Sequence, residues 1–175
     1  MDVSDEIAVY EQMLGTLDHL LEKAACQERA GGGEPDGLIS ATLAPGMFNL
    51  GQHVGLACSI ASEFVERLKL DGQGPGAEAG EGEATIESLQ WLIGRTRLRL
   101  DGLRAAPPRY EEGATIKIET PTGQTFEMTD RQFVSDWSLP QFYFHIVIAY
   151  AILRAHGADL GIRDYLGHVA RYMKH

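Results

Sequence analysis

The segment from Gln141 to Leu153 constrains the fold more than any other part of the chain. It reads QFYFHIVIAYAIL, with no Asp, Glu, Lys or Arg at any position. Ser138 and Gln141 match a capping box, and Pro140 suits the first turn of a helix. A helix that is apolar all round must be buried on every side. We therefore expect this segment to lie inside a larger helical assembly.

Three earlier stretches predict amphipathic helices that can cover it. In each, apolar residues recur at steps of three and four, which places them on one helix face. The first ends at glycines 31–33, the second runs from about Phe48 to Leu70, and the third ends before Pro107. The inward residues of the three stretches are Ile7, Tyr10, Leu14, Leu17, Leu21 and Ala24; Leu50, His53, Ala57, Ile60 and Phe64; and Ile86, Leu89, Ile93, Thr96, Leu100 and Leu103. Together with the apolar helix they predict an all-α four-helix bundle.

The remaining segments connect or extend these helices within a single domain, residues 1–175. Residues 71–83 are rich in Gly, Ala, Glu and Pro, which is typical of a flexible linker. Alternation over residues 114–128 predicts a small β-hairpin inserted before the last long helix. Residues 129–132 match a capping box for a short helix. We expect the tail, residues 158–175, to fold back over the bundle.

Charge, hydropathy and cysteine content exclude several functional classes. Lys and Arg number 15 against 25 Asp and Glu, so the net charge is −10, which argues against nucleic-acid binding. No apolar run reaches the ~20 residues of a membrane span, and the acidic start does not resemble an export signal. Cys26 and Cys58 lack metal-ligand or disulfide spacing. We expect a cytoplasmic protein without a membrane or nucleic-acid partner.

The fully apolar helix requires more cover than a bundle of this size readily supplies. The tail can provide that cover, or a second copy of the chain can. We favour a homodimer.

Two of the six histidines, His53 and His145, lie on apolar faces of different long helices. A buried imidazole needs partners for both nitrogens, and one solution is a metal ion shared across the bundle core. Gln141 lies four residues before His145 and can add a carbonyl oxygen, although the capping box gives it another role. The alternative is a pair of core histidines satisfied by backbone, water or each other.

Four sequence blocks resemble one family of uncharacterised bacterial and fungal proteins, a domain of unknown function within the DinB/YfiT-like metalloenzyme superfamily. The blocks are LAPGMFNL (residues 43–50), QFYFH (141–145), AYAILR (149–154) and LGIRDYLG (160–167). The resemblance implies a DinB-like four-helix bundle of the up-down-down-up type that is often dimeric. It also implies a divalent metal held by three histidines, one on the second helix and a His-x3-His pair on the fourth. Some superfamily members are thiol-dependent transferases or isomerases.

Matched to that pattern, the chain has two of the three histidines. His145 falls at the second histidine of the pair, Gln141 falls at the first, and His53 falls at the second-helix ligand. Two functions therefore stay open, and neither identifies catalytic residues. One is a non-catalytic dimeric bundle with a degenerate core pocket that binds a small molecule or nothing. The other is a divalent-metal enzyme, with zinc or nickel, that resembles the thiol-dependent transferases.

Overall fold

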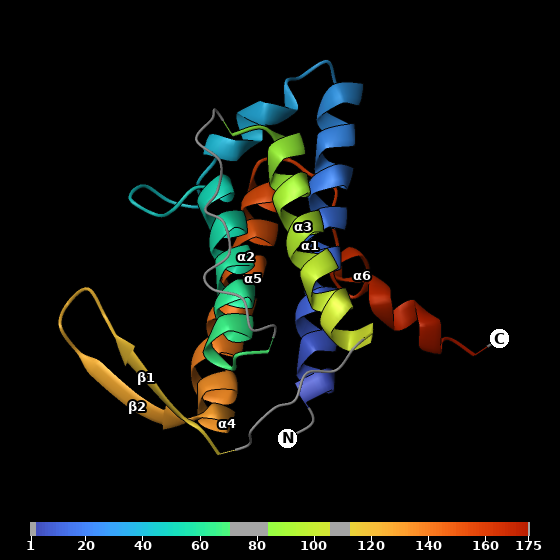
Figure 1. Cartoon of the computed structure of the whole chain (residues 1–175). Helices are drawn as coiled ribbons and strands as arrows, with labels where there is room; N and C mark the ends of the chain where they lie inside the picture. Colours follow the sequence, from blue (N-terminus) through green and yellow to red (C-terminus); the bar gives the residue numbers. More distant parts are fainter. Residues whose placement is uncertain (1–2, 71–83, 106–112, 175) are drawn as a thin grey trace.

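Four long helices form the body of the molecule in a computed structural model that describes residues 3–70, 84–105 and 113–174. They are α1 (Val3–Ala30), α2 (Leu50–Arg67), α3 (Ile86–Ala105) and α5 (Leu139–Ala155), and they lie side by side (Figure 1). Helix α1 packs mainly against α3, and α2 mainly against α5, while contacts between α2 and α3 and between α1 and α5 close the bundle. The predicted helical bundle is confirmed. The predicted linker at residues 71–83 lies outside the described residues.

The predicted apolar stripes form the core between the helices. Tyr10, at its centre, is completely buried, and its ring stacks on Phe64 at 4.5 Å and packs against Phe142 at 4.7 Å between ring centroids. The Tyr10 hydroxyl donates a hydrogen bond of 2.6 Å to Oγ of Ser138. One side chain of α1 therefore contacts α2, α5 and Ser138, the residue just before α5.

Helix α2 begins two residues later than the sequence pattern predicted. Asn49 is its N-cap: the Asn49 side chain accepts from the Gln52 backbone N–H at 2.8 Å, and the Gln52 side chain accepts from the Asn49 N–H at 2.9 Å. This capping box leaves Phe48 outside the helix, where its side chain is 53% exposed. It also places His53 at the start of α2, facing α5. The short helix η1 (Pro35–Ser40) precedes this loop.

The predicted hairpin is present and stands out from the bundle (Figure 1). Strand β1 (Thr115–Glu119) pairs antiparallel with β2 (Thr125–Thr129), with Thr115 opposite Thr129. Gly123 supplies the positive φ of 81° that the turn needs. Thr129 then caps α4 (Asp130–Gln132), as the sequence predicted.

The predicted capping box of Ser138 and Gln141 is wrong. A π-helical turn, η2 (Phe133–Ser138), runs directly into α5, so Ser138 has helical backbone angles and caps nothing. Its hydroxyl instead accepts the bond from Tyr10. The Gln141 amide donates to the carbonyl of Trp137 at 3.0 Å. The tertiary contact with Tyr10 and the continuous helix replace the local cap.

The expectation that α5 is buried on every side is also wrong for the single chain. One face is buried, through Phe142, Ile146, Ala149, Ile152 and Leu153. The opposite face exposes Tyr143 (37%), Phe144 (53%) and Val147 (44%), which we call the α5 stripe. A corner helix of a four-helix bundle is enclosed on one side only, whatever its composition.

The tail folds against α1 and leaves the α5 stripe uncovered. It comprises α6 (Ile162–Tyr165) and η3 (Gly167–Tyr172), and neither contains a buried residue. Leu160, just before α6, is buried in the core. The expected cover of α5 by the tail is thus not provided within one chain. Among the described residues, no helix combines the length and hydropathy that a membrane crossing requires.

Candidate functional site

The structure brings together the two histidines that the sequence singled out. The Nδ1 atoms of His53 on α2 and His145 on α5 lie 2.9 Å apart, and the ring centroids are separated by 5.1 Å. His53 is 2% exposed and His145 is half-buried. The pair therefore lies at the edge of the core, with one ring reaching toward solvent.

The two Nδ1 atoms lie at hydrogen-bond distance, so one Nδ1 carries a proton and donates it to the other. Burial lowers the pKa of His53, partly offset by the backbone of Phe48; burial and then the neighbouring His53 lower the pKa of His145. Both rings are therefore neutral near pH 7, with one Nδ1 donating to the other. Within the described part of the chain, Nε2 of His53 is buried without a hydrogen bond of good geometry. Donation from His53 Nδ1 is favoured, because the reverse leaves a buried N–H unpaired.

The lowered pKa values predict that metal-free protein loses stability in mild acid. A histidine whose pKa is lower in the folded state than in the unfolded state binds fewer protons when folded, so its contribution to stability is complete above the unfolded pKa of about 6.5. That contribution is lost as the pH falls through the folded pKa values. We expect the free energy of unfolding, measured by urea denaturation with a chelator present, to fall from pH 7 toward pH 5.5.

Comparison of the variants His145→Leu and His19→Leu tests whether the His53–His145 pair causes this loss of stability in acid. His19 is exposed on α1, with its Nε2 3.6 Å from Oδ1 of Asp164, and His19→Leu is the control that removes a histidine while keeping the pair. His145→Leu should flatten the pH dependence, because it removes one of the two rings whose pKa is lowered. Equal slopes for the wild type and His145→Leu would contradict a coupled pair.

Gln141 is the third residue of the predicted ligand set. It is exposed on α5, and its amide is engaged with the Trp137 carbonyl. The described residues contain no group of three or more His, Cys, Asp or Glu side chains placed to hold a metal ion. The ligand candidates that the structure brings into contact are the imidazoles of His53 and His145.

The pair fits a metal ion as a two-point chelate. An ion at about 2.05 Å from two nitrogens 2.9 Å apart makes an N–metal–N angle of roughly 90°, and a separation of about 3.3 Å would give a tetrahedral angle. Coordination through Nδ1 places the proton of each ring on Nε2, and metal-bound imidazoles commonly donate that proton to a backbone carbonyl. Nε2 of His53 is buried without a hydrogen-bond partner among the described residues, so this proton would still need an acceptor.

Two aromatic residues that the sequence analysis did not single out flank the pair. The Phe48 ring lies 6.0 Å from His53, and the Phe144 ring lies 5.3 Å from His145 and 6.3 Å from His53. Both rings are 53% exposed. The sequence contained a signal that could have identified Phe48. It directly precedes an Asn-x-x-Gln capping box, and the residue before such a box lies outside the helix. A ligand at the histidines would meet apolar walls on both sides.

Neither cysteine has the properties of a nucleophile. Cys58 is buried, and burial raises its pKa to about 12. Cys26 is exposed, and its hydrogen bond to Glu22 raises its pKa. Both thiols stay protonated at neutral pH, which removes the reactive thiolate.

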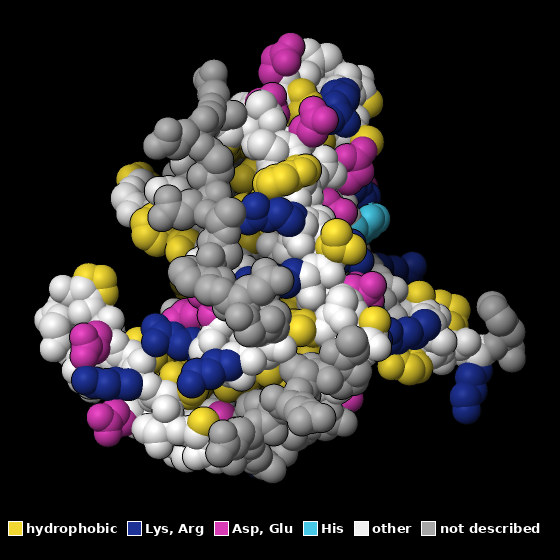
Figure 2. Space-filling view, viewed as in Figure 1, with side chains coloured by type: hydrophobic (Ala, Val, Ile, Leu, Met, Phe, Trp, Pro, Cys, Tyr) yellow, Lys and Arg dark blue, Asp and Glu magenta, His cyan; other side chains and the backbone are white. Residues whose placement is uncertain are grey.

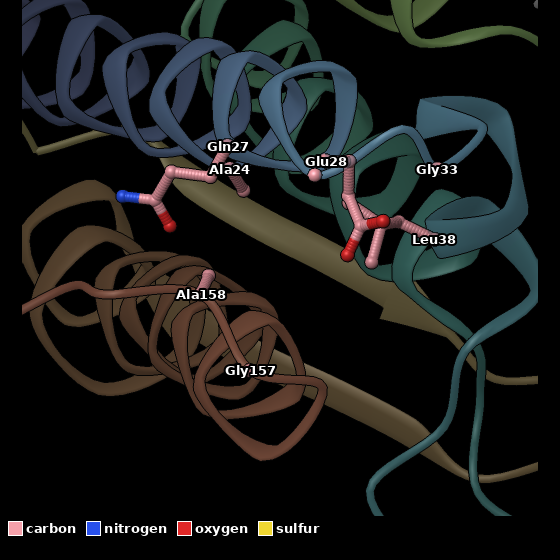
Figure 3. Close-up of a pocket in the computed structure, with 8 residues that line it drawn as sticks. Ala24, Gln27, Glu28, Gly33, Leu38, Gly157 and Ala158 are labelled. Atoms are coloured by element: carbon pink, nitrogen blue, oxygen red, sulfur yellow. The ribbon is translucent and has the colours of Figure 1, made fainter.

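A separate hollow lies where α1 and α5 end (Figure 3). Its volume is about 200 Å³, below the roughly 300 Å³ at which small-molecule pockets begin. Glu28 is its acidic side chain, facing Gly157 and Ala158 across the gap. None of the predicted site residues lines it, so this hollow is not the predicted pocket.

Comparison with known proteins agrees with the architecture. A solved structure described as a DinB family member from Shewanella denitrificans is 30% identical, with a TM-score of 0.77 over 94% of this chain and 92% of that chain. No curated protein matches the chain. The family model of a domain of unknown function, DUF1993, matches residues 4–166. The chain therefore belongs to the DUF1993 family and has a DinB-like helical-bundle fold.

Proposed function

We propose that this protein binds a divalent cation at the His53–His145 pair and presents the open coordination positions to a small ligand. The observation that carries the proposal is the 2.9 Å approach of two neutral Nδ1 atoms from different helices. Imidazole nitrogens suit zinc and nickel among the divalent ions. Two protein ligands support a weaker site than the usual three or four.

Each residue then has a defined part in binding. His53 and His145 hold the ion, and the half-buried position of His145 gives access from solvent. Phe48 and Phe144 provide apolar contact for a ligand and reduce the access of water. When bound, the ion supplies Lewis-acid chemistry or a bound water of lowered pKa. An activity of the thiol-dependent transferase type is the enzymatic form of this proposal.

The second candidate is a non-catalytic bundle that has lost its metal. The hydrogen bond from Gln141 to Trp137 favours it, because a side chain that satisfies a backbone carbonyl is not poised as a ligand. In this case a hydrogen bond between the two Nδ1 atoms stands where the ion would bind. The His53–His145 contact then serves only to hold α2 against α5.

Metal content distinguishes the two candidates. We expect untagged protein, purified without chelators, to contain up to one equivalent of zinc or nickel by mass spectrometry, and to bind added zinc in calorimetry. His53→Ala should abolish both signals while the circular dichroism spectrum stays helical. His19→Ala, which removes an exposed histidine, is the matched control. Wild-type protein that is folded yet takes up no zinc or nickel would overturn the proposal in favour of the metal-free bundle.

We further propose that the protein is a homodimer. The α5 stripe exposes three large apolar side chains on one helix face, and such a surface usually marks an interface. Sedimentation velocity should give a mass near twice the 19.2 kDa of the chain.

A further inference from the structure

The tail is attached to the bundle by its polar side chains. Asp164 on α6 accepts from Lys23 on α1 at 2.7 Å, and Arg171 on η3 donates to the side chain of Gln12 at 2.9 Å. Both contacts are to α1. The side chains of Asp164 and Arg171 therefore hold the tail on the bundle.

Several apolar side chains of the tail are exposed, whereas Leu160 and Tyr165 pack on the bundle. The exposed ones are Ile162 (65%), Leu166 (40%), Val169 (44%), Tyr172 (67%) and Met173 (69%), and the first four recur at steps of three and four. Figure 2 shows hydrophobic and basic side chains together on the segment that projects from the body. An amphipathic segment on a bundle normally turns its apolar face inward. The exposure of five large apolar side chains on one short segment is typical of a surface that meets a second apolar surface.

The α5 stripe begins next to the tail. The ring of Tyr165 on α6 lies 6.1 Å from that of Tyr150 on α5, and Tyr143 of the stripe adds to the effect of burial in raising the pKa of Tyr165. The contacts of Asp164 and Arg171 with α1 hold the tail beside the stripe of its own chain rather than over it. Two neighbouring apolar surfaces of one chain thus stay uncovered.

Charge favours a second copy of this chain as the partner. Between residues 162 and 174 the tail has three basic residues and one acidic residue, in a chain of net charge −10. Glu6 lies near the α5 stripe, since its charge helps to raise the pKa of Tyr143. Burial and then the neighbouring Asp5 raise the pKa of Glu6. A basic tail from another chain would supply a counter-charge there.

We propose that two copies of the chain pair by what we call tail exchange: each tail stays attached to its own α1, while its apolar face packs on the α5 stripe of the other copy and its basic residues approach Glu6 there. A two-fold axis makes the two contacts equivalent and closes the assembly as a dimer. The inference rests on the proposed homodimer and adds the surfaces that form it.

Charge substitutions in the two surfaces test the inference by sedimentation. Val169→Glu changes the tail and Val147→Glu changes the stripe, both at side chains that are 44% exposed. Each should raise the dimer dissociation constant at least 100-fold, because each buries a carboxylate in an apolar interface. Leu98→Glu is the matched control, since Leu98 is 73% exposed on α3 and lies outside both surfaces. It should leave the dissociation constant unchanged, and circular dichroism verifies that all three variants fold.

Cross-linking tests whether the tail meets the stripe of another chain. Chains with Val169→Cys are mixed with chains with Val147→Cys, both in a Cys26→Ser background that removes the exposed native thiol. A short bis-maleimide should join the two kinds of chain in the mixture. When either kind of chain is treated alone, we expect less cross-linking than in the mixture.

The sedimentation results distinguish the proposed tail contact from the proposed homodimer. If Val147→Glu dissociates the dimer and Val169→Glu does not, the dimer stands and the tail exchange is overturned. A monomeric wild type overturns both. Binding of a monomer to phosphatidylserine vesicles, lost in Val169→Glu, would assign the tail to a membrane surface and overturn the exchange as well.

Discussion

Replacing Tyr10 with alanine is expected to lower the free energy of unfolding by about 4 kcal/mol, the range for removing a large aromatic side chain from a core. The ring is completely buried and contacts both Phe64 and Phe142, so its loss opens a cavity between α1, α2 and α5. It also leaves the hydroxyl of Ser138 without its donor. Urea denaturation followed by circular dichroism measures the change.

Two further variants separate packing from hydrogen bonding at this position. Tyr10→Phe keeps the ring and removes only the bond to Ser138, and should cost about 1 kcal/mol. Trp91→Ala removes an aromatic side chain that is 61% exposed on α3, and should change stability by roughly 0.5 kcal/mol or less. A Tyr10→Phe cost equal to that of Tyr10→Ala would show that the hydrogen bond, rather than packing, dominates.

The features that the sequence predicted correctly are those that follow from periodicity. A step of three or four residues fixes which side chains share a helix face, so His53 and His145 were both expected to face the core. Their contact then required only that α2 and α5 be neighbours, and the structure shows that they are. The hairpin and the Thr129 cap were predicted for the same local reasons.

The features that the sequence did not predict depend on contacts between distant residues. Ser138 has the composition of a cap, but Tyr10, 128 residues away in the chain, takes its hydroxyl. The fully apolar α5 indicated burial without showing which surface would cover each face. The α5 stripe and the apolar side chains of the tail are exposed because the tail packs against α1, and this contact cannot be predicted from periodicity.

Position 141 decides how strong a metal site this bundle can form. Gln141 and His145 are one helical turn apart, the spacing at which two side chains meet on one face of α5. A histidine at each of two positions four residues apart is a proven way to hold zinc on a helix. The side chain now at 141 is an exposed amide that makes one bond to a backbone carbonyl, so replacing it should cost little stability.

Gln141→His is therefore expected to strengthen zinc binding on the order of 100-fold, equivalent to about 2.7 kcal/mol, by adding a third nitrogen to His53 and His145. Competition titration against a chelating dye measures the affinity. Gln141→Ala should bind zinc as the wild type does, because the native amide does not coordinate, and the double variant with His53→Ala should lose the gain. If Gln141→Ala instead weakens binding tenfold or more, Gln141 is already a ligand and must leave Trp137 when the ion binds. Unchanged affinity in Gln141→His would mean that the ion lies beyond reach of this turn of α5, which contradicts the proposed placement between the two rings.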